Sequence, residues 1–181
     1  MTVVVAPIEA YAAEVVDAIG AVVPVAGAYV LGSALLGGFD PSTSDLDVVV
    51  VAERPLEADE RARVWRALDE LPAPVRKLEL VVYAAGARPP AYDLNYPDGD
   101  GEAGFWFVLD AAIGQERSRP LRGRPWRELL EPVTEAETRR AAEELLRWAE
   151  ERGDELARPH GVRARHYLEH GTWMTKAEAR R

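Results

Sequence analysis

The chain lacks cysteine altogether, and it has only two lysines, Lys77 and Lys176, among its 181 residues. Without cysteine it has no disulfide, no thiol nucleophile and no zinc site built on thiolates. Positive charge is also scarce, since 22 basic residues face 31 acidic ones and leave a formal net charge of −9. Such a surface repels phosphate backbones, so we expect no nucleic-acid partner, whereas a small polycationic molecule would be attracted.

An apolar run suited to a membrane span is missing as well. Residues 18–39 carry no charge, but this stretch contains Pro24 and several glycines, which interrupt a helix. The N-terminus lacks a basic segment before an apolar one, so no signal peptide is expected. We therefore predict a cytoplasmic protein without a membrane partner, and a monomer is favoured.

Hydrophobic periodicity predicts helices over residues 7–21, 58–71 and 105–115, and strands over residues 28–31, 46–51 and 75–83. A Gly/Ser/Pro-rich loop is expected over residues 32–44, a short strand over 92–96 and a connector over 120–132. Thr134 and Glu137 form a capping box that opens a helix to about residue 152, and another helix is expected over 162–170. The predicted fold class is α/β (α+β), a small mixed sheet flanked by helices and followed by a short helical domain.

Two carboxylates open the second predicted strand. Asp45 and Asp47 are two residues apart, so both point to the same face while Leu46 points to the other. Neighbouring carboxylates repel each other and lose hydration energy on burial, and a divalent cation removes that penalty. Hard oxygen ligands favour Mg²⁺, which usually keeps phosphate oxygens among its ligands. The pair therefore indicates a site for a nucleotide.

Three further residues fit such a site. Gly32 has no side chain, so a phosphate can approach its backbone closely, and Ser33 offers a hydroxyl and a main-chain N–H. Glu79 lies in the third strand, on the face opposite to Leu78, Leu80 and Val82. A carboxylate inside an apolar strand requires a partner, and a metal held with Asp45 and Asp47 would supply one.

Residues 31–47, LGSALLGGFDPSTSDLD, resemble the signature of the DNA polymerase β-type nucleotidyltransferase superfamily. That signature consists of Gly-Ser, a spacer, two acids one residue apart and a later acidic strand residue. Within the superfamily the chain most resembles the aminoglycoside (3″)(9) adenylyltransferases. The segments KLELVVY, LRGRPWRELLEPVTEAE and RARHYLEHGTWMTKAEA carry this resemblance as well.

The resemblance implies a nucleotidyltransferase domain at residues 1–132 and a helical domain at residues 133–181. It implies that Asp45, Asp47 and Glu79 bind Mg²⁺, with two ions expected, and that Glu79 is also the catalytic base. Gly32, Ser33, Arg163 and Lys176 would bind the triphosphate of ATP. The acceptor would be an aminoglycoside of the streptomycin or spectinomycin type.

The chain also departs from that family. The acceptor residues near the start of the helical domain match poorly in spacing, and Trp148 and Asp154 are the candidates in that region. Packing in the core is the alternative interpretation of Trp148, because it lies among Ala141, Leu145 and Ala149. Family members continue with further helices beyond the lysine, whereas this chain ends five residues after Lys176, so a truncated helical domain is expected.

Other functions stay open from the sequence alone. The acceptor could be a different molecule, including a protein side chain, or the chain could be a non-catalytic, antitoxin-like partner protein of the same fold. His166 and His170 match the H-x-x-E-H pattern of zinc peptidases. Such a site needs a third protein ligand, so we interpret them instead as solvated helix residues.

Overall fold

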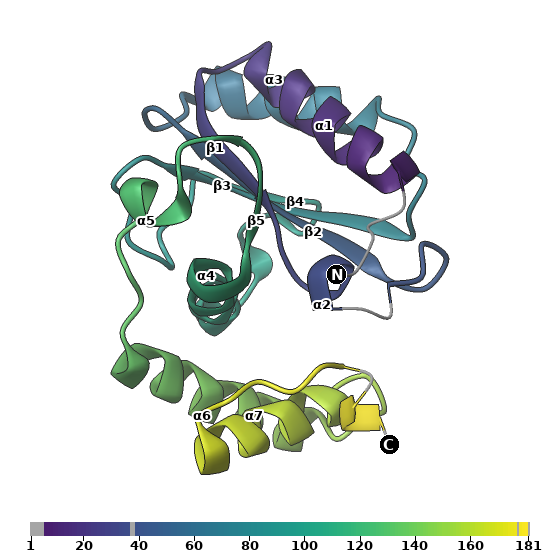
Figure 1. Ribbon diagram of the computed structural model, residues 1–181, viewed down its shortest axis with the longest axis vertical. Helices are drawn as coiled ribbons and strands as arrows, with labels where there is room; N and C mark the ends of the chain where they lie inside the picture. The colour runs from purple at the N-terminus through teal and green to yellow at the C-terminus, as the bar shows by residue number, and fades with distance from the viewer. Residues whose placement is uncertain (1–5, 37–38, 177, 181) are drawn as a thin grey trace.

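The computed structural model describes residues 6–36, 39–176 and 178–180, and it forms a sheet with helices on both faces (Figure 1). Gly37 and Gly38 of the predicted loop 32–44 lie outside these residues. The elements, in chain order, are α1 (Ala6–Gly20), β1 (Val25–Val30), α2 (Ser33–Leu36), β2 (Asp45–Ala52), α3 (Ala58–Asp69), β3 (Lys77–Ala84), β4 (Leu94–Tyr96), the 3₁₀ turn η1 (Gly99–Gly101), α4 (Gly104–Arg117), β5 (Arg119–Gly123), α5 (Trp126–Leu129), α6 (Glu135–Arg152), α7 (Arg158–His170) and η2 (Glu178–Arg180).

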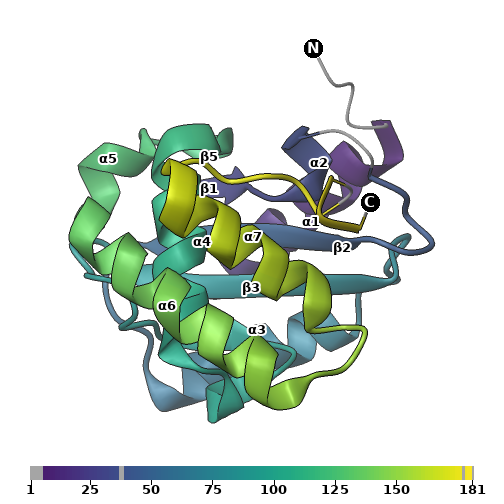
Figure 2. The same cartoon turned by 90° about the horizontal axis from the view of Figure 1, so that it is seen from below.

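The five strands are ordered β4-β3-β2-β1-β5, so the sheet is mixed, as predicted. Strands β2 and β3 pair in parallel, while the other three pairs are antiparallel. Helices α1 and α3 cover one face, and α4 and α5 lie on the other (Figure 1). Seen from below, α6 and α7 cross beneath α4 as a third layer (Figure 2). Within the described residues, no helix combines the length and the apolar character that a bilayer span requires.

Alternation along the central strands decides which side chains face each layer. Leu46, Val48 and Val50 of β2 pack with α1 and α3 in one core. Val49 and Val51 belong to the core on the α4 side. Because side chains alternate, Asp45 and Asp47 share the face of Val49 and Val51. The two acids therefore lie on the side of the sheet that carries α4 and the helical layer.

The prediction of a plain connector over residues 120–132 is wrong, because this segment contains strand β5 and helix α5. Strand β5 forms an edge of the sheet and is largely exposed, so it shows no apolar alternation. Pro120 is tolerated at such an edge, where a missing N–H leaves no central hydrogen bond unmade. Trp126 of α5 packs edge-on against Tyr29, with ring centroids 5.1 Å apart.

Helix α6 begins where the sequence predicts. The Thr134 side chain accepts a hydrogen bond from the Glu137 N–H, and the Glu137 side chain accepts one from the Thr134 N–H, which confirms the capping box. The helix ends at Gly153, whose φ of 65° is in the left-handed region. Helix α7 starts earlier than predicted, at Arg158, because Pro159 fits the first turn of a helix.

Candidate active site

The parallel pairing of β2 and β3 brings two predicted acids together. In its register Asp47 is opposite Glu79, and Asp45 is opposite Lys77. All four side chains point to the α4 side, since Leu46, Leu78 and Leu80 fill the core on the other face. The sequence places Glu79 on this face, and the structure shows that Lys77 shares it, with its Nζ 3.2 Å from Glu79 Oε1.

Gly32 fits closely against Asp47. Its φ is +65°, and a Cβ built there would lie 1.8 Å from Asp47 Oδ2. The residue before Gly32 also contacts Asp47, because the Leu31 N–H donates a hydrogen bond of 2.9 Å to the Asp47 carbonyl. Ser33 follows at once as the first residue of α2. The end of β1 and the start of β2 are thus joined tightly, and only glycine allows the Asp47 carboxylate its position.

Gly32→Ala should therefore lower turnover by about tenfold or more, because Asp47 must move, and it should also lower stability by about 1–2 kcal/mol through backbone strain. The matched control is Gly86→Ala. Gly86 has a φ of +80°, and no atom lies within 4 Å of the place that a Cβ would take, so the control carries the strain without the clash. Thermal melts and ATP turnover of both variants test the prediction. Equal activity of the two variants would contradict it.

The Asp47 carboxyl is an unfavourable place for a negative charge. Its pKa is raised well above the usual value, first by desolvation and then by the charges of Glu79 and Asp110. The charge of Lys176 opposes this rise, and a hydrogen bond with the Glu79 side chain adds to it. Burial and like charge therefore both favour a proton or a cation at this position.

Asp45, the other acid of the predicted metal pair, forms an ion pair with Arg76. Its Oδ1 accepts a hydrogen bond of 2.5 Å from Arg76 Nη2. On the neighbouring strand, Lys77 bridges Glu79 and Asp98, with a distance of 2.7 Å from its Nζ to Asp98 Oδ2. Across residues 6–36, 39–176 and 178–180, no three His, Cys, Asp or Glu side chains form a ready metal-binding group. Two of the three predicted metal ligands, Asp45 and Glu79, are thus paired with the basic side chains of Arg76 and Lys77.

The helical layer contains the two predicted phosphate-binding cations, Arg163 and Lys176, whose charges act on Asp47 and Asp110. Arg163 lies on α7, where its Nε donates a hydrogen bond of 2.9 Å to the Met174 carbonyl and its guanidinium lies over the Trp173 ring. Burial lowers the pKa of Arg163, and the charges of Asp110 and Asp47 raise it. The exposed Lys176 acts electrostatically on the same two acids. The charges of Asp47 and of these two residues, which lie 116 and 129 positions further along the chain, thus act on one another.

The two candidate acceptor residues have structural partners. Trp148 packs edge-on against Trp106, with ring centroids 5.3 Å apart, and the Arg152 guanidinium lies over its ring. The Asp154 carboxylate accepts hydrogen bonds from Arg152 Nε at 2.5 Å and from the Ala157 N–H at 2.8 Å. Trp148 therefore packs within an aromatic cluster, and Asp154 connects α6 to α7.

Sequence reasoning missed Asp110, a fourth carboxylate near the cluster. Its side chain is exposed to solvent, yet surrounding protein raises its pKa to about 6, chiefly by desolvation and next by the charge of Glu79. Its signal in the sequence was available, because Asp110 is the only charged residue between Gly104 and Ile113.

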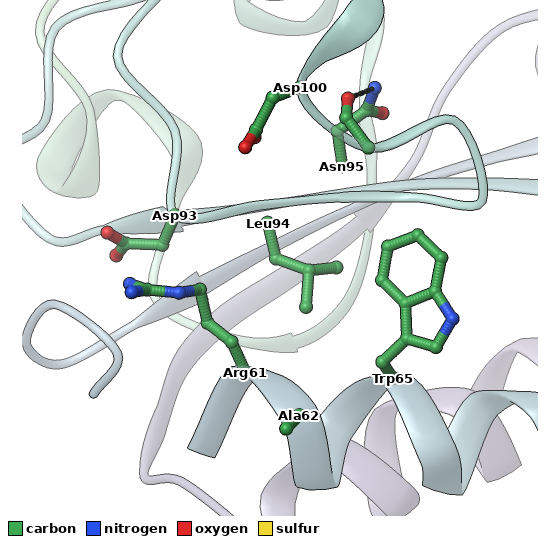
Figure 3. A pocket seen from close by; sticks show the side chains of 8 residues that line it. Arg61, Ala62, Trp65, Asp93, Leu94, Asn95 and Asp100 are labelled. Atoms are coloured by element: carbon green, nitrogen blue, oxygen red, sulfur yellow. Dashed lines mark hydrogen bonds between the residues drawn. The ribbon is translucent and has the colours of Figure 1, made fainter. Parts of the chain in front are cut away.

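Two pockets have linings that do not include Asp45, Asp47 or Glu79. One of about 260 Å³ lies between α3 and β4 and is lined by Arg61, Trp65 and Asp93 among others (Figure 3). Another of similar volume lies between α4, α6 and the end of α7, beside Trp173. On α7, the rings of His166 and His170 have centroids 4.6 Å apart, and the described residues provide no group of three metal-binding side chains around them.

Comparison with known proteins agrees with this geometry. Residues 12–92, which span α1 to β3, match the family described as Nucleotidyltransferase domain. The fold is similar to spectinomycin adenyltransferase AAD(9) from Enterococcus faecialis, whose structure was solved with ATP and spectinomycin. That match has a TM-score of 0.70 and 17% sequence identity, and it covers 92% of this chain and 79% of the other. No curated protein sequence matches the chain significantly. The family match over residues 12–92 and the similar fold both agree with the resemblance found in the sequence.

Proposed function

We propose that the protein transfers AMP from ATP to a hydroxyl group of a small cationic acceptor, an aminoglycoside of the streptomycin or spectinomycin type, in a Mg²⁺-dependent reaction. One observation carries this proposal: Asp47 and Glu79 are adjacent on parallel strands, and the charges of Asp47 and of Arg163 and Lys176 in the helical layer act on one another. Acids that hold a metal and cations that neutralise phosphates are the two parts that phosphoryl and nucleotidyl transfer require.

The residues present fit a divalent cation. Asp45, Asp47 and Glu79 supply only carboxylate oxygens, which suit Mg²⁺, and a cation would offset the desolvation and like charges that raise the pKa of Asp47. Asp45 would exchange its bond with Arg76 for the metal. Bound Mg²⁺, with two ions expected, would neutralise charge on the triphosphate and on the attacking oxygen. Gly32 and Ser33 would meet the phosphates on one side, and Arg163 and Lys176 on the other.

Glu79 is the proposed base. Its carboxylate would accept the proton of the acceptor hydroxyl as that oxygen bonds to the α-phosphorus of ATP. The bond from the α-phosphorus to the bridging oxygen would break, and pyrophosphate would leave. Lys77, 3.2 Å from Glu79 and bonded to Asp98, holds the carboxylate in place. Positioning and charge neutralisation would supply most of the rate gain.

The acceptor class is inferred from charge and from the structural neighbour. A net charge of −9 attracts cations and repels nucleic acids. The similar AAD(9) structure was solved with spectinomycin as well as ATP. Not every acid of α6 is available for an acceptor, because Glu137 pairs with Arg88 and Glu150 pairs with Arg165. Trp148 and Asp154 remain candidates for contact with the acceptor.

The direct test is incubation with labelled ATP, Mg²⁺ and a panel of aminoglycosides, with the mass of the adduct as the readout. An increase equal to one adenylyl group on streptomycin or spectinomycin would support the proposal. Transfer to a different acceptor, or to none of the panel, would remove the aminoglycoside assignment while leaving the nucleotidyltransferase fold in place.

Binding of spectinomycin or streptomycin should weaken as salt rises, because screening at a Debye length of about 8 Å reduces the attraction of a cation to this acidic protein. It should tighten when Mg²⁺ and a non-hydrolysable ATP analogue are present, since the metal and nucleotide would bring the two layers together. Calorimetric titration of each drug at low and high salt, with and without the analogue, measures both effects. A binding constant that does not respond to salt would contradict the charge argument.

A further inference from the structure

Arg76 lies next to the candidate metal ligands without being one of them. It immediately precedes β3, and its backbone N–H donates a hydrogen bond of 2.8 Å to the Pro41 carbonyl, in the loop that leads into β2. Its guanidinium Nη2 lies 2.5 Å from Asp45 Oδ1. The backbone contact therefore fixes the start of the side chain beside this loop, and the guanidinium at its end reaches a candidate metal ligand.

The ion pair of Arg76 and Asp45 is unevenly buried. The Asp45 side chain is 12% exposed, whereas the Arg76 side chain is 53% exposed. Within the part of the chain that the structure describes, the Arg76 guanidinium bonds to no other side chain. Water screens the attraction at a half-exposed guanidinium, so such a pair is weak. Arg76 can therefore leave Asp45 for another anion at little cost.

Lys77, the next residue, is held more firmly. Its Nζ is 2.7 Å from Asp98 Oδ2 and 3.2 Å from Glu79 Oε1, and its side chain is 30% exposed. Two acids therefore engage Lys77, whereas one acid engages Arg76. Of the two cations bonded to candidate metal ligands, Arg76 is thus the one that is free to change its partner.

The Arg76 guanidinium is also close to where a metal-bound phosphate would lie. Ligand oxygens are about 2.0–2.1 Å from Mg²⁺ in near-octahedral geometry, so two of them are about 3–4 Å apart. A phosphate oxygen that shared an ion with Asp45 would lie that far from the Asp45 oxygen, which already has Arg76 Nη2 at 2.5 Å. A change of side-chain rotamer covers such a distance. A guanidinium suits phosphate, because its planar fork can donate two parallel hydrogen bonds.

We propose that Arg76 is a nucleotide-binding residue that changes partners: it is the counter-ion of Asp45 in the metal-free protein, and it binds a phosphate oxygen of ATP once Mg²⁺ has replaced it at Asp45. The inference rests on the proposed function for the metal and the nucleotide, but not for the acceptor. It adds a phosphate-binding cation from the edge of β3 to Arg163 and Lys176 of the helical layer. It also couples the two ligands, because the metal releases the residue that the nucleotide binds.

The test compares Arg76→Gln with Arg63→Gln, which removes a guanidinium of similar exposure, 51%, from α3 on the opposite face of the sheet (Figure 1). The metal site is probed with Mn²⁺ alone, which accepts the same oxygen ligands as Mg²⁺, by titration of its electron paramagnetic resonance signal. Calorimetry gives the Kd of a non-hydrolysable ATP analogue with Mg²⁺.

For Arg76→Gln we expect effects of opposite sign. Without its competitor at Asp45, Mn²⁺ should bind about two- to fivefold more tightly, the range for an exposed ion pair. The nucleotide analogue should bind about 10–100-fold more weakly, the range for losing a charged hydrogen bond. Arg76→Lys keeps the charge but not the fork, so its nucleotide affinity should lie between those of wild type and Arg76→Gln. Arg63→Gln should match wild type in both measurements.

A purely structural role of Arg76 would move both affinities in the same direction. If Arg76→Gln weakens metal and nucleotide binding equally, or leaves nucleotide binding unchanged, the inference is wrong. The mass of the drug adduct is measured in parallel. Nucleotide binding that depends on Arg76 without transfer to any drug would remove the aminoglycoside assignment and keep the inference, whereas a wild-type protein that binds neither Mn²⁺ nor the analogue would remove both.

Discussion

Asp47→Asn is expected to lower Mg²⁺-dependent ATP turnover by about 10³-fold or more, while the fold becomes at least as stable as that of the wild type. The loss follows from removing one of the charges that would hold the metal, which is worth several kcal/mol in the transition state. The gain in stability follows because the Asp47 pKa is raised by desolvation and by Glu79 and Asp110, so the ionised form weakens the fold.

The gain in stability of Asp47→Asn should depend on pH. A carboxyl whose folded pKa lies above its unfolded value favours the fold when protonated, so this contribution is present below pH 4 and disappears as the pH rises through the folded pKa. The variant should therefore gain most over wild type at neutral pH and least near pH 4. Thermal melts at both pH values and a turnover assay measure this.

Asp59→Asn, at an exposed site on α3, is the charge-matched control. A variant that unfolds, or that keeps wild-type turnover, contradicts the assignment.

Glu79→Gln should lower the rate of the chemical step by about 10²–10⁴-fold with only a modest loss of nucleotide affinity. This range is the usual contribution of a positioned general base. Glutamine keeps the shape of the side chain and an oxygen for Lys77, but it cannot take the proton of the acceptor hydroxyl. Single-turnover kinetics with saturating ATP separate the chemical step from binding.

The exposed Glu53, just beyond the end of β2, provides the control Glu53→Gln, which should retain wild-type kinetics. If Glu79→Gln loses nucleotide affinity and turnover to the same extent, Glu79 acts as a metal ligand and not as the base. A rate within a few fold of wild type would exclude both roles.

Asp110 illustrates why part of the site escaped prediction. The motif that carries Gly32, Ser33, Asp45 and Asp47 is contiguous in the sequence, so its chemistry can be recognised from spacing alone. Asp110 has no such context, since it is a single acid within the apolar stretch from Gly104 to Ile113. Its importance depends on how α4 packs beneath the sheet, because only that packing brings it near Glu79.

The engagement of Asp45 shows a second limit. Period-two alternation correctly assigns Asp45 and Asp47 to one face, and the parallel register then sets Asp47 opposite Glu79. Alternation does not determine which basic groups reach the same acids. Arg76 precedes β3 and Lys77 begins it, and their long side chains take up Asp45 and Glu79. Those ion pairs depend on the three-dimensional position of the chain before β3.

The sequence by itself determined the fold class, the central strands, the α6 capping box and the acid pair behind the Gly-Ser turn. These features depend on residues close in the chain, whose periodicity and side-chain chemistry act locally. The tertiary structure alone decided that the polar segment after α4 forms the edge strand β5 and that the charge of Asp110 acts on Arg163. Edge pairing and long-range charge contacts join segments far apart in the chain, so no local pattern specifies them.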